Sequence, residues 1–207
     1  MPLILRVAAD APDPAVIREA VELIRRGLVV AYPTDTLYGL AVDPRNGGAV
    51  KRLFELKGRA ETSALTLIAA DLAHVRAAGE TSDAAERLAA QWWPGPLTIV
   101  MRARPILARE MLAGGGTVGI RIPDHAVAIA LARDAGFPIT ATSANRSGGT
   151  PASTADAVAE ALPDVDAIVD AGPVRGGAPS TIVDASASVT LLRQGVVPWD
   201  KVLRSLR

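Results

Sequence analysis

The sequence predicts a mixed α/β fold, in which a single twisted sheet with mixed strand directions is flanked by helices. Short apolar runs typical of strands alternate with longer segments that have helical periodicity. The alternation follows no strict strand–helix–strand repeat, which argues against a purely parallel sheet. The 207 residues contain no stretch with the composition of a linker, so one domain over residues 1–207 is expected.

In the N-terminal half, a helix comes first and leads directly into a strand. Asp13 and Pro14 form an N-cap and first-turn pattern, and Gly27 ends the helix that they begin. The apolar residues 29–32 then predict a buried strand that Pro33 breaks. The other elements expected in this half are helix 49–56, strand 65–70, a helix from about 71, helix 82–92 and strand 97–101.

In the C-terminal half, residues 117–123 predict a strand that contains an arginine. Alternation would place Val118, Ile120 and Ile122 on one face, with Thr117 and Arg121 at or near the other. The other elements expected here are helix 105–112, helix 125–135, strand 138–142, a helix from 153 or 154 to 162, strands 167–169, 180–183 and 189–192, and helix 199–206.

Composition excludes several classes of function. The chain has 22 lysines and arginines and 22 aspartates and glutamates, so no overall basic field can hold a nucleic acid backbone. Cysteine is absent, which excludes disulfides, thiolate metal sites and a cysteine nucleophile. No signal-peptide pattern and no apolar run of about 18 residues occur, so a soluble cytoplasmic protein is expected.

The familiar catalytic and nucleotide-binding motifs are missing as well. The sequence has no glycine-rich dinucleotide fingerprint, no P-loop, no nucleophile elbow and no metal-ligand spacing, so no metal held by protein ligands is expected. His74 and His125 lie in predicted helices far from the polar loops. We interpret both as surface or capping residues.

What remains is a set of six polar clusters, each at the end of an apolar strand or helix. They are Thr34-Asp35-Thr36, Lys57-Gly58-Arg59, Thr117 with Arg121, Ser143-Ala144-Asn145, Ser180-Thr181 and Arg193. Each cluster alone fits an ordinary turn or helix end. Together they combine cations with hydroxyl and amide groups and lack a good nucleophile. This combination favours binding and polarising a polyphosphate over covalent catalysis.

These clusters belong to longer motifs that occur in a fixed order. The motifs are YPTDTLYGL at 32–40, KGR at 57–59, PGPLTIV at 94–100, VGIRIP at 118–123, TSANRSGG at 142–149, PSTIVD at 179–184 and LRQG at 192–195. In this order they resemble the YrdC/TsaC-like threonylcarbamoyl-adenylate synthase family, from about residue 15 to residue 199. The resemblance implies a YrdC-like twisted sheet around a concave, locally positive cavity.

The resemblance also implies an activity and its substrates. Members of the family join L-threonine, bicarbonate and ATP into threonylcarbamoyl-AMP and pyrophosphate, and the product feeds threonylcarbamoyladenosine modification of tRNA. No protein nucleophile is needed, because the carbamate of threonine attacks the α-phosphorus. Positioning and electrostatics would therefore dominate catalysis, with Mg²⁺ accompanying ATP. Transient contact with the threonylcarbamoyl-transfer machinery and weak tRNA binding are further expectations.

Matching the motifs residue by residue implies a role for each polar group. Thr36 and Arg121 would bind threonine, with the guanidinium on its carboxylate, and Ser180 would lie near the amino acid. Lys57 and Arg59 would be the catalytic cations. The nucleotide would be bound by Lys57, Arg59, Ser63, Thr117, Ser143, Asn145 and Arg193. Thr34 and Asp35 are expected to shape the turn that aims Thr36.

The chain departs from the family pattern at three positions. Ala60 and Ala64 stand where many relatives have prolines, and Ile68 stands where some longer relatives place a histidine near threonine. Two alternative functions remain open at this point. One is a module that recognises RNA by shape, and the other is a paralogue with the same fold that acts on another carbamoyl substrate.

Overall fold

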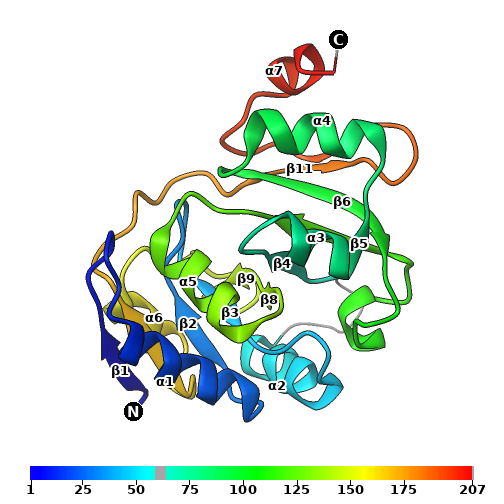
Figure 1. Cartoon of the computed structure of the whole chain (residues 1–207). Coiled ribbons are helices and arrows are strands. Elements are labelled where there is room, and N and C mark those ends of the chain that lie inside the picture. The colour runs from blue at the N-terminus through cyan, green and yellow to red at the C-terminus, as the bar shows by residue number, and fades with distance from the viewer. Residues whose placement is uncertain (59–63, 207) are drawn as a thin grey trace.

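The strands of the chain form two sheets rather than the single sheet expected, in a computed structural model that describes residues 1–58 and 64–206 (Figure 1). The first sheet has the order β1-β10-β2-β3-β9. Its strands are β1 (Leu3–Arg6), β10 (Ala167–Asp170), β2 (Val30–Tyr32), β3 (Gly39–Ala41) and β9 (Thr142–Ser143). Parallel and antiparallel pairs both occur, which confirms the mixed α/β class.

The second sheet has the order β12-β11-β6-β7-β4-β8, and β5 pairs with β6 beside that path. Its strands are β12 (Thr190–Arg193), β11 (Thr181–Asp184), β6 (Leu97–Ala103), β7 (Thr117–Arg121), β4 (Thr66–Ile68), β8 (Ile139–Thr140) and β5 (Gly79–Glu80). β7 lies between β6 and β4, antiparallel to the first and parallel to the second.

The two sheets meet where the expected strand 138–142 divides. β8 pairs with β4 in the second sheet, whereas β9 pairs with β3 in the first. Ala141 lies between them, and its backbone N–H donates to Thr66 O at 2.7 Å. The chain thus changes sheets within a few residues, which the apolar pattern of residues 138–142 does not reveal.

Two helices cover one face of the first sheet. α1 (Pro14–Arg25) and α5 (Ala126–Ala135) lie side by side and share a core with β2 and β10 (Figure 1). The predicted cap of α1 is confirmed, because the Asp13 carboxylate accepts a hydrogen bond of 2.8 Å from Ala15 N. The helix ends at Arg25, and Gly27 follows in the left-handed region at a φ of 81°.

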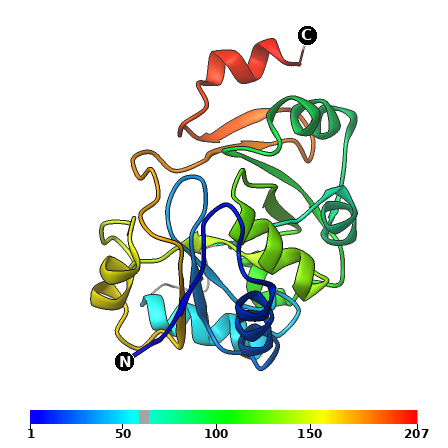
Figure 2. The same cartoon turned by 60° about the vertical axis from the view of Figure 1, so that its left-hand side comes forward.

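The other helices contribute side chains to a second core, which also contains side chains from strands of the second sheet. They are α2 (Gly47–Lys57), α3 (Leu72–Ala78), α4 (Asp83–Trp92), the 3-10 helix η1 (Arg109–Leu112), α6 (Ala155–Ala161) and α7 (Trp199–Arg204). α7 and the N-terminal strand lie at opposite ends of the molecule (Figure 2). None of the helices in the described residues has the length and apolar character needed to cross a bilayer.

Three short strands were not predicted from the sequence. β1 is an edge strand with exposed Leu3 and Ile4, so its side chains lack the half-buried alternation that predicts a strand. β3 and β5 have three and two residues and each contains a glycine, which is rare in strands. Hydrogen bonds to neighbouring strands, rather than local propensity, define all three.

Candidate functional site

A cavity of about 260 Å³ opens where the two sheets meet, and it collects side chains from most of the predicted clusters. Strand ends of both sheets and the loop between β2 and β3 form its walls. The residues that line it are Thr34, Thr36, Leu37, Tyr38, Gly39, Ala64, Thr66, Leu67, Ile68, Thr98, Arg121, Ala141, Thr142, Ser143, Pro151, Pro179, Ser180, Ile182 and Arg193.

The turn after β2 aims Thr36 into this cavity. The buried Thr34 hydroxyl donates to Leu37 O at 2.7 Å and accepts from the N–H groups of Thr36 and Leu37. This confirms that Thr34 shapes the turn. The hydroxyls of Thr34 and Thr36 lie 3.1 Å apart. The bonds to Leu37 O, Thr36 N and Leu37 N use the proton and both lone pairs of Thr34 Oγ1, so the Thr36 hydroxyl keeps lone pairs that can accept a ligand N–H.

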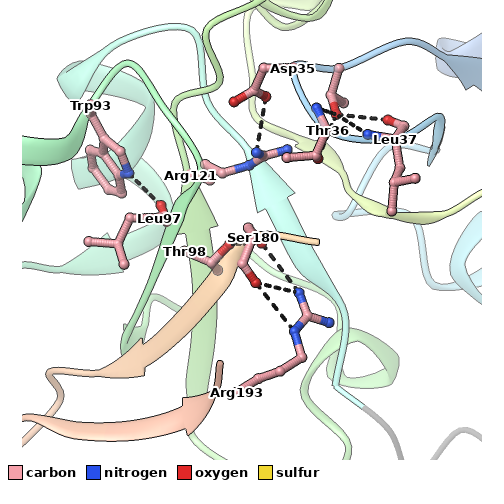
Figure 3. A network of polar contacts seen from close by, with 10 residues as sticks. Asp35, Thr36, Leu37, Trp93, Leu97, Thr98, Arg121, Ser180 and Arg193 are labelled. Carbon is pink, nitrogen blue, oxygen red and sulfur yellow. Dashed lines mark hydrogen bonds and ion pairs between the residues drawn. The ribbon is translucent and has the colours of Figure 1, made fainter. Parts of the chain in front are cut away.

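Arg121 extends from the end of β7 toward the same turn and forms an ion pair with Asp35 (Figure 3). Arg121 Nη1 lies 3.0 Å from Asp35 Oδ1, and the two side chains are only 7% and 13% exposed. Asp35 therefore does more than shape the turn, because it orients the guanidinium and balances its charge. Tyr32 lies buried nearby and donates to Thr140 O at 2.9 Å. Burial raises the pKa of Tyr32 far above its ordinary value, so its hydroxyl stays protonated.

A second arginine enters the cavity from β12. Arg193 Nη2 donates to Ser180 O at 2.9 Å and to Ser180 Oγ at 3.3 Å, and Ser180 Oγ lies 2.9 Å from Thr98 Oγ1 (Figure 3). Burial lowers the pKa of the Arg193 guanidinium, and repulsion from Arg121 lowers it further. Among the described residues Arg193 has no carboxylate in ion-pair range. Two arginines therefore line the cavity and one of them is paired with a carboxylate, which favours an anionic ligand.

Lys57 lies behind the cavity and supports one of its walls. It is the last residue of α2 and is 3% exposed. Its ammonium donates to Ser143 O and, at 2.7 Å, to Asn145 O, while Lys57 O accepts from Ser147 N at 2.8 Å. The structure thus brings Lys57, Ser143 and Asn145 together, as expected. The described contacts of the ammonium are with backbone carbonyls, so its role on the phosphates stays a prediction.

Asn145 holds the loop that follows β9. Its Nδ2 donates to Arg146 O at 2.6 Å and to Gly149 O at 2.8 Å. Its Oδ1 is buried without a hydrogen-bond partner among the residues that the structure describes, so this oxygen can still accept a donor.

The remaining predicted residues do not reach the cavity or lie outside the described residues. Thr117 is at the opposite end of β7 from Arg121, about 13 Å along the strand, and does not line the cavity. Arg59 and Ser63 fall in residues 59–63, outside the described residues. Sequence reasoning missed Thr66 and Thr98, which line the cavity from β4 and β6. Their signal was a hydroxyl within an apolar strand on the face that also carries Arg121.

His125 differs from the expected capping residue. It occupies the N-cap position of α5, but its side chain makes no capping hydrogen bond. Its Nδ1 is buried and has no hydrogen-bond partner within residues 1–58 and 64–206. Desolvation lowers the pKa of His125, and Asp35, Asp10 and Asp124 partly offset this.

Comparison with known proteins places the chain among relatives of the same architecture. It is 38% identical over 190 residues to the threonylcarbamoyl-AMP synthase of Bacillus subtilis (strain 168), covering 90% of this chain and 55% of that protein. It is 37% identical over 169 residues to the threonylcarbamoyl-AMP synthase of Thiobacillus denitrificans, covering 81% of this chain and 90% of that protein.

The structural comparison agrees. The crystal structure of P. abyssi Sua5 complexed with L-threonine superimposes with a TM-score of 0.93 at 35% identity, covering 98% of this chain and 60% of that one. The chain spans little more than half the length of the B. subtilis protein. Residues 22–195 match the Sua5/YciO/YrdC family, described as "Telomere recombination". This match covers most of the sequence, and the chain belongs to the Sua5/YciO/YrdC family.

Proposed function

We propose that this chain is an L-threonylcarbamoyladenylate synthase, which joins L-threonine, bicarbonate and ATP into threonylcarbamoyl-AMP and pyrophosphate. The observation that carries the proposal is the cavity with two guanidinium groups and several hydroxyls. Such a cavity can align two anionic substrates and offers no obvious nucleophile. Relatives named threonylcarbamoyl-AMP synthase, and a close structural match to a protein crystallised with L-threonine, support it.

In this proposal threonine binds between the β2–β3 turn and the end of β7. Arg121 would pair with its carboxylate, and the Asp35 ion pair holds the guanidinium in place for this contact. Thr36 would accept an N–H of the amino group through a lone pair of its hydroxyl. The amine must lose a proton before it adds to carbon dioxide derived from bicarbonate. Thr36 would position the amine for that step.

ATP would contact the cavity residues Ser143 of β9 and Arg193 of β12. Lys57 holds Ser143 and Asn145 in place. Arg59, Ser63 and Thr117 remain predicted nucleotide contacts. The described residues include no group of three acidic or histidine side chains that could hold a metal ion. We propose that Mg²⁺ arrives with the phosphates of ATP.

The chemistry needs alignment more than covalent participation. A carbamate oxygen attacks the α-phosphorus while the bond to pyrophosphate breaks, so negative charge moves onto the leaving group. Two anions must approach each other, and the cations Arg121 and Arg193 offset their repulsion. A place in tRNA threonylcarbamoyladenosine modification, contact with its transfer machinery and a cytoplasmic location complete the proposal.

The test is synthesis by the purified chain, given ATP, Mg²⁺, bicarbonate and labelled threonine. We expect threonylcarbamoyl-AMP and pyrophosphate in equal amounts, and only when threonine is present. Arg121→Lys should raise the KM for threonine roughly 10- to 150-fold, because a hydrogen bond to a charged group contributes about 1.5–3 kcal/mol. The KM for ATP should change far less.

Arg102→Lys is the matched control, because Arg102 is an exposed arginine on the neighbouring strand β6. It should leave both KM values unchanged. Pyrophosphate release that does not depend on threonine would contradict the proposal. So would tight, salt-dependent RNA binding without synthesis, which would favour the RNA-recognition alternative.

A further inference from the structure

Gly119 lies in the middle of the sheet face that forms the floor of the cavity. It is the third residue of β7, two positions before Arg121, so both residues lie on the same face. On the flanking strands its partners are Thr66 of β4 and Val100 of β6. Thr66 lines the cavity. Thr98, two residues before Val100 on β6, lines it as well.

The absence of a side chain at Gly119 lets these two threonines close over β7. A Cβ atom at this position would lie 2.9 Å from Thr66 Cγ2 and 3.0 Å from Thr98 Cγ2, with Val100 Cγ2 at 3.4 Å. The first two distances are shorter than carbon atoms tolerate without moving apart. The two threonine methyl groups therefore occupy the space that any larger residue at 119 would fill.

Neither threonine can easily rotate to make room. Threonine is β-branched and has few favourable χ1 rotamers. The Thr66 hydroxyl donates to Ala141 O, and the Thr98 hydroxyl lies 2.9 Å from Ser180 Oγ. Rotation of either side chain would break its hydrogen bond. An added methyl group would therefore push the floor upward into the cavity or displace Ser180.

We propose that Gly119 is a specificity-determining residue that sets the depth of the amino-acid pocket and thereby its preference for threonine over serine. The inference rests on the proposed function. An amino acid whose carboxylate pairs with Arg121 extends from there over the neighbouring floor. Gly119 touches no substrate itself and acts through Thr66 and Thr98. Raising the floor removes space for the threonine methyl group, which serine does not need.

The test compares Gly119→Ala with wild type, using threonine and serine as competing substrates. The ratio of kcat/KM for threonine to that for serine should fall about tenfold, since one methyl group in a tight pocket changes kcat/KM by roughly 10- to 200-fold. The KM for ATP should stay within about twofold. Gly116→Ala is the matched control, because a Cβ there meets nothing within 4 Å. It should leave the ratio unchanged.

A rescue variant separates pocket depth from general damage. Gly119→Ala combined with Thr66→Ser and Thr98→Ser removes the two methyl groups that the new Cβ would meet and keeps both hydroxyls. It should recover most of the lost discrimination relative to Gly119→Ala. If Gly119→Ala fails to fold, this triple variant should fold and is then compared with the Thr66→Ser/Thr98→Ser variant. A further loss of discrimination when Gly119→Ala is added to that double variant would overturn the inference.

Calorimetric binding of threonine and serine distinguishes the two proposals, because it needs no turnover. Absence of product from wild type would count against the proposed function. A folded Gly119→Ala protein with an unchanged preference for threonine over serine, in turnover and in binding, would overturn the inference about Gly119.

Discussion

At the scale of single residues, Lys57 shows how a cation can support a site by binding the backbone carbonyls of a neighbouring loop. Its ammonium is buried and donates to Ser143 O and Asn145 O, so it holds the loop after β9 against the end of α2. The helix itself ends here, because Gly58 adopts a left-handed φ of 57°. A loss of activity in a Lys57 variant would therefore have a displaced loop as one source and, if the proposed nucleotide contact exists, a missing phosphate contact as the other.

Lys57→Met separates these sources by its effect on stability. We expect the free energy of unfolding to fall by about 2–4 kcal/mol, because two buried carbonyl groups lose a charged donor. Urea denaturation measures the change. Lys51→Met, at an earlier position in α2, is the control: Lys51 Nζ lies 3.6 Å from Glu110 Oε1 and its side chain is 53% exposed. Its loss should stay below about 0.5 kcal/mol. Equal effects in the two variants would contradict the anchoring role of Lys57.

At the scale of elements, the β11–β12 hairpin positions Arg193, and Thr181 anchors this hairpin. The fully buried Thr181 hydroxyl donates to Val197 O at 2.7 Å and accepts from Gly195 N and Val197 N at 3.0 Å. These bonds tie the chain just after Arg193 to the start of β11. Gly195 permits the close approach, since a Cβ there would lie 2.2 Å from Pro179 O.

Thr181→Val keeps the shape of the side chain and removes these hydrogen bonds. The free energy of unfolding should fall by about 2–4 kcal/mol, because buried backbone groups lose their partner. Chemical denaturation measures the loss, and Thr190→Val at an exposed position of β12 should change stability by less than about 0.5 kcal/mol. A stability close to wild type in Thr181→Val would show that the hairpin does not depend on this hydroxyl.

At the scale of the whole molecule, charge is balanced overall and concentrated locally. The formal net charge is zero, yet Arg121 and Arg193 line the same cavity. His125 is a half-buried base whose buried Nδ1 has no hydrogen-bond partner among the described residues. Asp35, Asp10 and Asp124 act on it from three separate segments and only partly offset its desolvation. Folding therefore favours the neutral imidazole.

This gives a pH dependence of stability with a definite sign. Desolvation lowers the pKa of His125 in the folded state below the ordinary 6.5, so the unfolded chain binds more protons as the pH falls through that value. The free energy of unfolding should decrease from about pH 7.5 to pH 5. His125→Gln should make this decrease smaller. Denaturation curves at several pH values measure it, and parallel profiles for wild type and His125→Gln would contradict the assignment.

Much of the fold was predictable because its signals are local. The N-cap of α1, the end of β2 at Pro33 and the helix from Asp83 to Trp92 follow from caps, prolines and periodicity. The division into two sheets was not predictable. It depends on hydrogen bonds of the two-residue strands β8 and β9 to partners about 70 and 100 residues earlier in the chain.

The sequence by itself determined which polar groups are available and, through the order of its motifs, the family to which they belong. Tertiary structure decided how they are used. It pairs Arg121 with Asp35, buries Lys57 on backbone carbonyls and leaves Thr117 at the far end of β7. It also places Gly119 beneath two threonines. The physical reason is that caps and periodicity act over a few residues, whereas ion pairs and packing depend on which strands become neighbours.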